Sequence, residues 1–199
     1  LEPGGTLTAN DSVAADTLAF LGGAMAGTGN VVPTSQYIVK NTAVARDLGG
    51  SAELIVSGSG ELSGTNTYAG KTSVSGGGTL TVADLDQNVG AGHLEVDNGY
   101  IASSGTIARN IGTADGQIAF AGNFGFTADG ADLTVTFNGG APLEWNTHFG
   151  GHTLLLDQLG SHTVEITNDI DFQGSRSFNF GGPRGTADVG LILSGNLTA

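Results

Sequence analysis

The sequence predicts an all-β fold in the form of a parallel β-helix, or β-solenoid, and three observations carry that prediction. Short apolar runs alternate with polar residues at a period of two, which is the pattern of β-strands. Clusters of Gly, Asn and Asp follow almost every run and indicate turns. Glycine makes up 35 of the 199 residues without a Gly-X-Y period, which excludes collagen and favours a fold with many turns.

The expected strands are short and follow one another along the chain. In order, the clearest are residues 6–9, 52–56, 79–82, 93–96, 117–120, 132–137, 163–166 and 177–180. No stretch of comparable length carries a helical stripe of apolar residues. The nearest helical candidate is a turn within residues 13–21, which is short and ends at Gly22-Gly23.

The spacing of the strands distinguishes the parallel β-helix from its main competitor, an antiparallel sandwich. Asn98-Gly99 and Asn138-Gly139 are typical hairpin turns and favour the sandwich. Coils of about 20 to 25 residues, each with two or three short strands, fit the turn spacing better. At that length, residues 1–199 form a single solenoid domain of roughly eight to ten coils, in a rod about 40 to 48 Å long.

Charge and composition exclude several partners and sites. The chain has 19 acidic and 6 basic residues, a net charge of −13 and no basic cluster, so we expect no binding to nucleic acid or anionic membranes. The absence of cysteine excludes disulfides, zinc–thiolate sites and a thiol nucleophile. The longest weakly polar run, residues 18–27, is too short for a transmembrane helix. Because the chain starts at Leu1 and ends in a strand-like run at 191–197, we expect it to be a segment of a longer protein.

Residues 58–82 carry a repeat motif. It consists of the series Leu62-Ser63-Gly64-Thr65-Asn66-Thr67-Tyr68-Ala69-Gly70-Lys71-Thr72-Ser73-Val74, followed by Gly78-Thr79-Leu80. This series resembles the autotransporter-associated β-strand repeat, or passenger-associated transport repeat, whose usual form is close to L-S-G-x-N-x-Y-x-G-x-T-x-V with a trailing G-T-L. The motif departs from the family at its entry, where Gly60-Glu61 stands in place of an additional Leu-x step, so we expect the preceding coil to bend or shorten.

The resemblance implies a right-handed β-solenoid in the exported passenger of a bacterial surface protein. Residues 120–197 resemble, more weakly, the spacer coils between such repeats. The family is thought to use the repeat to assist outer-membrane transport and folding, and that export role rests on the family alone. We therefore expect a secreted or cell-surface location.

The residues of the motif point to structural roles. We expect Val74, Leu80 and Val82 to face inward. Gly64 and Gly70 are expected to turn corners at φ values that other residues avoid.

Two polar residues of the motif are also expected to be structural. Asn66 suits a hydrogen bond to the turn backbone. Tyr68 is expected to pack along the coil with its hydroxyl at the surface.

Other motifs do not predict a nucleotide or transition-metal site. Residues 64–72 end like a phosphate-binding loop, but five residues rather than four separate the glycines and no helix can follow. His148 and His152 are four residues apart and His162 follows, but no carboxylate pattern completes a metal site. We interpret the three histidines as solvated or corner residues.

Three acidic pairs raise the question of calcium. Asp84/Asp86, Glu95/Asp97 and Asp169/Asp171 each place two carboxylates on one face of a strand. Such pairs can bind calcium on β-helices, but the strong G-G-x-G-x-D repeat is absent and residues 181–188 only imitate it. We predict solvated strand faces and no cofactor, with structural calcium as the less favoured alternative.

The leading hypothesis is a noncatalytic extracellular solenoid that serves as a stalk, scaffold, adhesin or fibre segment and stacks end to end with neighbouring segments. The alternative is a module that binds carbohydrate or a host surface, with Trp145, Tyr100, Tyr68 or Phe149 as stacking platforms, although we favour a partly buried Trp145. A polysaccharide-degrading enzyme is disfavoured. Thr167-Asn168-Asp169 resembles the start of a pectin-hydrolase signature, but the rest of that signature is missing.

Overall fold

The computed structural model describes residues 1–11, 13–26, 31–157, 162–181 and 190–199, and its regular structure is nearly all β. The first nine strands are β1 (Thr6–Thr8), β2 (Val13–Phe20), β3 (Ala24–Ala26), β4 (Val31–Val39), β5 (Thr42–Val44), β6 (Glu53–Leu62), β7 (Thr72–Val82), β8 (Leu94–Asp97) and β9 (Gly99–Arg109). The others are β10 (Ile118–Phe120), β11 (Phe124–Phe137), β12 (Leu143–Glu144), β13 (Leu154–Asp157), β14 (Val164–Ile166), β15 (Ile170–Asp171), β16 (Phe178–Gly181), β17 (Leu191–Leu193) and β18 (Leu197–Thr198). Three short helical segments lie between them: α1 (Leu85–Asn88), the 3-10 turn η1 (Asn138–Gly140) and α2 (Trp145–Phe149).

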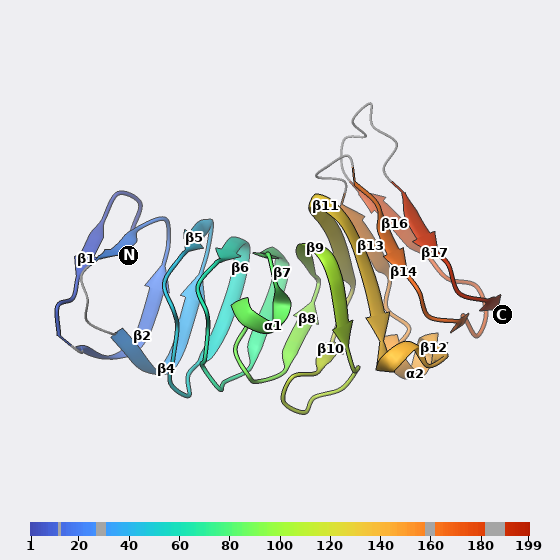
Figure 1. Cartoon of the computed structure of the whole chain (residues 1–199), viewed down its shortest axis with the longest axis horizontal. Coiled ribbons are helices and arrows are strands. Elements are labelled where there is room, and N and C mark those ends of the chain that lie inside the picture. The colour runs from blue at the N-terminus through green and yellow to red at the C-terminus, as the bar shows by residue number, and fades with distance from the viewer. Residues whose placement is uncertain (12, 27–30, 158–161, 182–189) are drawn as a thin grey trace.

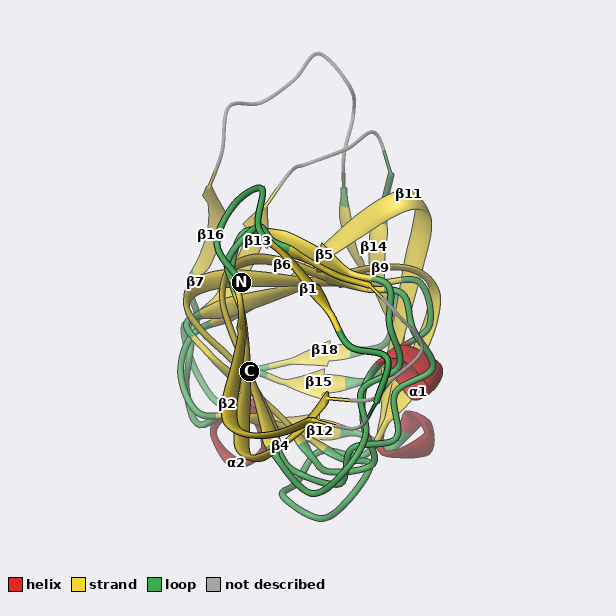
Figure 2. Cartoon of the chain, turned by 90° about the vertical axis from the view of Figure 1, so that its left-hand side faces the viewer, coloured by secondary structure: helices red, strands yellow, loops and turns green. Residues whose placement is uncertain are grey.

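The described strands pair in parallel throughout. The largest sheet runs in the order β16-β13-β11-β9-β7-β6-β4-β2, and these strands follow one another along the long axis of the molecule (Figure 1). Smaller sheets join β1 to β3 and order β12-β15-β18. In the view along the long axis, strands lie on several sides of the molecule and loops lie at the corners (Figure 2). The prediction of an all-β chain with parallel pairing is confirmed.

The antiparallel alternative and the helical candidate are both wrong. Asn98 joins β8 to β9, but these strands pair with other strands and not with each other. Asn98 and Asn138 have φ values of 53° and 50°, so they bend the chain without reversing it into a hairpin. The segment at 13–20 is strand β2, whose pairing with β4 outweighs its weak helical pattern.

The hydrogen bonds between successive turns of chain reveal an unequal repeat length. Near the N-terminus the Asp47 carboxylate accepts from the backbone of Thr65, 18 residues later. In the middle, Lys71 pairs with Glu95 at a separation of 24. Further on, Asp132 accepts from the backbone of Thr163 at a separation of 31. The expected length of 20 to 25 residues therefore holds in only some of the turns, as between β8 and β10 and between β13 and β16, which both pair at a separation of 24 residues.

Several strands are longer than the sequence predicts because they continue through glycine corners. The pairing of β6 with β7 shifts register between Ser57 and Ser59, and Gly58 between them has a φ of 103°. The pairing of β11 with β9 shifts between Ala128 and Leu133, around Gly130 with a φ of 76°. A positive φ is open to glycine at little steric cost, so the backbone turns without ending the ladder.

The core is one continuous cluster that changes composition along the axis. Toward the N-terminus it consists mainly of aliphatic side chains, such as Leu54 and Val56, together with two tyrosines, one of which is Tyr37. Toward the C-terminus it holds the tryptophan and most of the phenylalanines. No described helix is long and apolar enough to cross a bilayer.

Candidate functional site

The repeat motif occupies the end of β6, a corner and β7. Leu62, Tyr68, Thr72, Val74 and Leu80 are fully buried. Their column continues in register, because Val74 lies opposite Val56 of β6 and Val96 of β8. Val82 is also buried, so the three positions expected to face inward do so. The motif therefore builds the core of the molecule.

The glycines of the motif have a different role from the expected one. Gly64 and Gly70 do not have positive φ values. A Cβ on Gly64 would lie 2.4 Å from the carbonyl oxygen of Arg46, and a Cβ on Gly70 would lie 2.3 Å from that of Ala52. These glycines are required because the backbone of the preceding turn packs directly against them. Gly78 is similarly enclosed, since its Cβ would lie 3.0 Å from the backbone nitrogen of Gly58.

Asn66 connects three successive turns of the chain. Its side-chain oxygen accepts from the backbone N–H of Leu48 at 2.8 Å, and its amide nitrogen donates to the carbonyl of Asn88. Asn88 in turn donates to the carbonyl of Gly64 at 3.0 Å. The expected hydrogen bond is therefore made to the neighbouring turns, where it satisfies buried backbone groups.

Asn168 has the same role toward the C-terminus, although the sequence analysis did not predict that role for it. It is fully buried, and it accepts from the backbone N–H of Phe137 at 2.8 Å. Its amide nitrogen donates to the carbonyls of Phe137 and Ala141, both at 2.8 Å. This explains Asn168 as a corner residue of the fold.

The hydroxyl of Tyr68 lies inside the molecule and not at its surface. It forms a 2.6 Å hydrogen bond with the hydroxyl of Thr72. The ring lies 6.1 Å from that of Tyr37, whose hydroxyl donates to the carbonyl of Gly49 at 2.9 Å. Burial raises the pKa of both phenols, because the charged phenolate is poorly solvated there. These tyrosines stabilise the core and offer no ring to a ligand.

Two of the candidate stacking platforms are buried. Trp145 and Phe149 are each 1% exposed, and their ring centroids are 4.9 Å apart. The indole N–H donates to the carbonyl of His152 at 2.9 Å. Trp145 therefore cannot stack on a sugar unless the core opens.

Tyr100 is half-buried and covers a glycine of the next strand. Gly125 lies opposite Tyr100 in the β9–β11 ladder, and a Cβ on Gly125 would lie 2.4 Å from the Tyr100 ring. The ring thus lies flat on the sheet, where it shields backbone that glycine leaves uncovered. Of the four candidate platforms, Tyr68, Trp145 and Phe149 are buried and Tyr100 is half-buried.

Each of the three acidic pairs has a member with a structural partner. Among the described residues, no group of three or more His, Cys, Asp or Glu side chains is arranged to hold a metal ion. Asp84 caps α1 by accepting from the backbone N–H of Asp86 at 2.8 Å. Glu95 pairs with Lys71 at 2.8 Å, and Asp169 accepts from the backbone of Asn196 at 2.7 Å. The imitation of the calcium repeat at 181–188 lies almost wholly outside the described residues.

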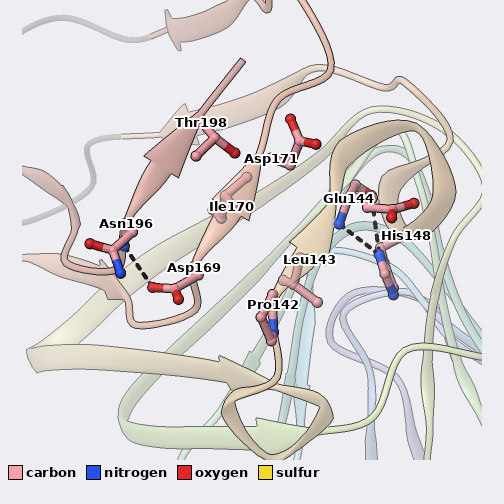
Figure 3. A pocket seen from close by; sticks show the side chains of 9 residues that line it. All are labelled: Pro142, Leu143, Glu144, His148, Asp169, Ile170, Asp171, Asn196 and Thr198. Carbon is pink, nitrogen blue, oxygen red and sulfur yellow. Dashed lines mark hydrogen bonds between the residues drawn. The ribbon is translucent and has the colours of Figure 1, made fainter.

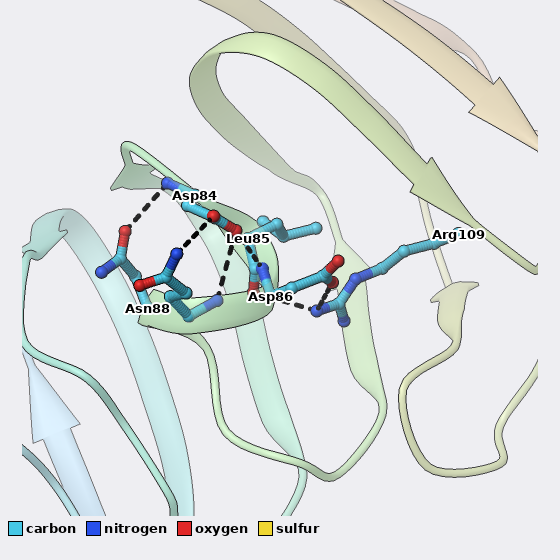
Figure 4. Close-up of polar contacts among 6 residues, drawn as sticks. Asp84, Leu85, Asp86, Asn88 and Arg109 are labelled. Atoms are coloured by element: carbon cyan, nitrogen blue, oxygen red, sulfur yellow. Dashed lines mark hydrogen bonds and ion pairs between the residues drawn. The ribbon is translucent and has the colours of Figure 1, made fainter.

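Arg109 is a buried cation that the sequence analysis missed. Its side chain is 5% exposed, and Nη2 donates to the carbonyl of Leu85 and to the carboxylate of Asp86, both at 2.9 Å (Figure 4). Arg109 thereby joins β9 to α1, one turn earlier in the chain. Its Nε and Nη1 atoms are buried without a protein partner. Arg109 faces inward because it follows the alternation of β9. Its buried charge is accommodated there because α1 packs beside it and supplies the two acceptors.

One shallow groove combines several polar groups. It has a volume of about 390 Å³ and lies over the sheet β12-β15-β18, beside α2 (Figure 3). Glu144 lies opposite Asp171, and Asp171 lies opposite Thr198, so one polar residue comes from each turn. At the edge, His148 Nδ1 lies 2.9 Å from the backbone nitrogen of Glu144 and 3.1 Å from its carbonyl oxygen, so the backbone of Glu144 holds the imidazole in place.

The groove is suited to binding hydroxyl groups. Carboxylate groups, an imidazole and the Thr198 side chain line an open surface. The sequence analysis identified Asp169 and Asp171 only as a possible calcium pair. The sequence analysis did not identify Glu144 and His148 as neighbours of these two residues. Positions that lie side by side on β12 and β15 are 27 residues apart in the chain.

Comparisons of this chain with protein-family models, curated proteins and solved structures found no significant match. The resemblance to the autotransporter-associated repeat therefore rests on the residues of the motif alone.

Proposed function

We propose that the chain is a segment of a right-handed parallel β-helix of roughly eight to ten coils that acts as a noncatalytic structural stalk or scaffold. One observation carries the proposal: the eight strands from β2 to β16 form one continuous parallel ladder, with buried apolar columns running from turn to turn. In such a stack each coil contacts its neighbours only, so backbone ladders and core columns together make a stiff rod.

The polar residues support a structural role. The carboxylates that the sequence offered as candidate calcium ligands cap a helix or form contacts between turns, as Asp84, Glu95 and Asp169 do. The proposed setting is the secreted or cell-surface passenger of a bacterial protein, in which the segment stacks end to end with other segments and can also serve as an adhesin. This setting follows from the resemblance of residues 62–80 to the transport-associated repeat.

Deletion of one complete coil tests the proposed architecture. Leu54 lies opposite Thr72, and Val56 lies opposite Val74, so removal of residues 54–71 brings Thr72 into the place of Leu54. A solenoid should tolerate this deletion and retain a cooperative unfolding transition with strand-type circular dichroism. As a matched control, removal of residues 54–62 shifts the following chain by half a coil and should abolish folding. Equal loss of folding in both variants would contradict the stack.

The noncatalytic part of the proposal needs its own experiment. Negative-stain electron microscopy at several protein concentrations tests the end-to-end stacking, which should give continuous fibres rather than separate short rods. Incubation with neutral, acidic and amino polysaccharides should release neither reducing ends nor unsaturated sugars. Release that is lost on Glu144→Gln or Asp171→Asn would overturn the noncatalytic assignment and move the groove to an active site.

The groove favours a second candidate function, the binding of surface glycans. The pairing of Glu144, Asp171 and Thr198 presents hydrogen-bonding groups from three turns at one open surface. A glycan array should then give a signal that Asp171→Ala removes and that Asp47→Ala, at the opposite end of the molecule, retains. A signal that Tyr100→Ala removes, and that Asp171→Ala retains, would instead place binding on the β9–β11 face.

A further inference from the structure

Two Asn-Gly pairs, Asn98-Gly99 and Asn138-Gly139, occupy corners of the fold. In an Asn-Gly pair the backbone attacks the asparagine side chain with unusual ease, because glycine has no Cβ to shield its own nitrogen. Attack of that nitrogen on the side-chain carbonyl carbon releases ammonia and closes a cyclic imide. Both pairs share this chemistry, so their surroundings decide which of them reacts.

The glycine of the first pair is held inside the sheet. Gly99 is buried in β9 opposite Phe124 of β11, and its backbone N–H donates to the carbonyl of Asn123 at 3.3 Å. On its other side, a Cβ on Gly99 would lie 2.8 Å from the carbonyl oxygen of Val74. The Gly99 nitrogen can therefore approach the Asn98 side chain only if the ladder between β9 and β11 opens.

The glycine of the second pair faces solvent. Gly139 is exposed in the middle of the 3-10 turn η1, with φ of 61° and ψ of 27°, and beyond the turn itself no atom lies within 4 Å of a Cβ built on it. The two ends of the turn are fixed, because the Asn168 amide donates to the carbonyls of Phe137 and Ala141. The middle of η1 lies between β11 and β12, so it can change its dihedral angles without opening a strand ladder.

The two asparagine side chains are also bonded in opposite ways. Asn138 accepts through Oδ1 from the backbone N–H of Ile111 at 2.8 Å. That donor withdraws charge from the side-chain carbonyl carbon and lies beside the oxygen on which negative charge develops during attack. Asn98 instead donates through Nδ2 to the Asp97 carboxylate at 2.8 Å. That bond holds the nitrogen that has to leave, and the carboxylate repels the developing negative charge.

We propose that Asn138 is a site of spontaneous covalent modification, at which the chain converts this asparagine to aspartate and isoaspartate. The Gly139 nitrogen loses its proton to hydroxide and bonds to Cγ of Asn138. The bond from Cγ to Nδ2 breaks, and Nδ2 takes up a proton from water and leaves as ammonia. A water molecule then opens the imide at either of its two carbonyls, which gives aspartate or isoaspartate. The net reaction consumes one water and releases one ammonia, without an oxidant or a cofactor.

The modification changes a contact between two turns of the chain. Aspartate keeps an oxygen in the place of Oδ1, so the Ile111 N–H retains its acceptor. Isoaspartate instead adds a methylene to the backbone between Phe137 and Ala141, whose carbonyls Asn168 holds, and attaches its carboxylate directly to Cα. The corner that joins Ile111 to residue 138 therefore weakens as isoaspartate accumulates. This effect goes beyond the stalk role and does not depend on it.

Peptide mapping by mass spectrometry of protein stored at mildly alkaline pH measures conversion at both pairs. In the folded chain Asn138 should convert about tenfold faster than Asn98, because reaction at Asn98 first breaks a buried backbone hydrogen bond. In urea at the same pH the two rates should differ much less, since both pairs are then free. Equal rates in the folded chain, or a faster Asn98, would overturn the proposal. The same ratio of rates in urea would do so too, because it would assign the difference to the local sequence.

Two variants link the modification to the corner. Asn138→Gln should keep its amide during storage, because glutamine has to close a larger ring that forms more slowly. Asn98→Gln is the matched control and should age as the wild type does. Thermal unfolding of fresh and stored samples, compared within each variant, should show a loss of stability in the wild type and in Asn98→Gln but none in Asn138→Gln. A loss that Asn138→Gln retains would contradict the proposed weakening of this corner.

Discussion

The N-terminal region (31–82) and the C-terminal region (118–181) show how one type of chain path accommodates different cross-sections. In the N-terminal region the turns repeat at 18 residues, and aliphatic side chains with Tyr37 and Tyr68 fill the interior. In the C-terminal region the repeat reaches 31 residues, and a cluster of aromatic rings fills the interior, including Phe124 and Phe149 stacked at 5.1 Å. A longer turn encloses more volume, and only larger side chains fill that volume at the density of a protein core.

The corners differ much less than the interiors. Gly70 in the narrow region and Gly195 near the C-terminus both pack against backbone, with Cβ positions 2.3 Å and 2.1 Å from a carbonyl oxygen of the preceding turn. Asn66 and Asn168 both use a buried amide to satisfy neighbouring turns. Turn length is therefore adjusted along the sides of the molecule, while the contacts between corners stay the same.

The largest expected effect is the loss of the tryptophan from the wide interior. Trp145→Ala should lower the free energy of unfolding by about 3–5 kcal/mol, because it leaves a cavity that aromatic neighbours cannot refill. Leu54→Ala in the narrow region removes less volume and should cost less, within the range of about 2–5 kcal/mol. Urea denaturation followed by circular dichroism measures both. A smaller loss of unfolding free energy for Trp145→Ala than for Leu54→Ala would mean that the wide interior is loosely packed.

The next effect compares the two corner asparagines. Asn168→Ala leaves two buried backbone groups and a partly buried one without their side-chain partner, and Asn66→Ala leaves two buried ones, at a cost of about 1–3 kcal/mol for each buried unsatisfied group before relaxation. Both variants should be destabilised by chemical denaturation, Asn168→Ala the more. If only one of the two variants is destabilised, the two regions do not stabilise their corners in the same way.

A third comparison concerns the glycines at the corners. Gly70→Ala and Gly195→Ala should each cost about 1–3 kcal/mol, because the new methyl group overlaps rigid backbone. Gly49→Ala is the control, since its methyl would lie 3.6 Å from the Thr67 hydroxyl in ordinary contact. Thermal unfolding should rank Gly49→Ala closest to the wild type. Equal losses at all three positions would show that close backbone approach is not what requires glycine.

The smallest expected effect is a loss of stability at high pH that begins in the N-terminal region. Burial raises the pKa of Tyr37 and Tyr68 above the usual value of 10.0, so the unfolded chain releases these protons before the folded one does. Their contribution to stability is complete below pH 10 and declines as the pH rises above it. Absorbance of tyrosinate at increasing pH, beside the fluorescence of Trp145 in the other region, measures the order of events.

Two substitutions identify the source of that pH dependence. The Tyr37→Phe and Tyr68→Phe double variant should lose less stability between pH 10 and higher pH than the wild type does. Tyr100→Phe, which leaves both buried phenols in place, should behave as the wild type. An alkaline transition that the double variant retains would assign it to other groups.

The strand pattern was predictable, but the length of the strands and of the turns was not. Alternation predicted a strand at 132–137, which lies within β11, and one at 163–166, which contains β14. The expected strands at 52–56 and 132–137 stop short of Gly58 and Gly130, whereas parallel neighbours hold the ladder together through these corners. The inward positions Val74 and Leu80 follow from a period of two, but the partners of Asn66 lie 18 and 22 residues away and no local pattern names them.

The sequence by itself determined the class of fold and which side chains face inward, because alternation and turn residues are local properties of the chain. Only the tertiary structure decided the positions that depend on stacking. It buried Trp145 and the hydroxyl of Tyr68, and it placed Arg109 against α1. It also aligned Glu144 with Asp171. The physical reason is that the length of each turn selects which distant residues become neighbours, and that length is set by how well the whole interior fills.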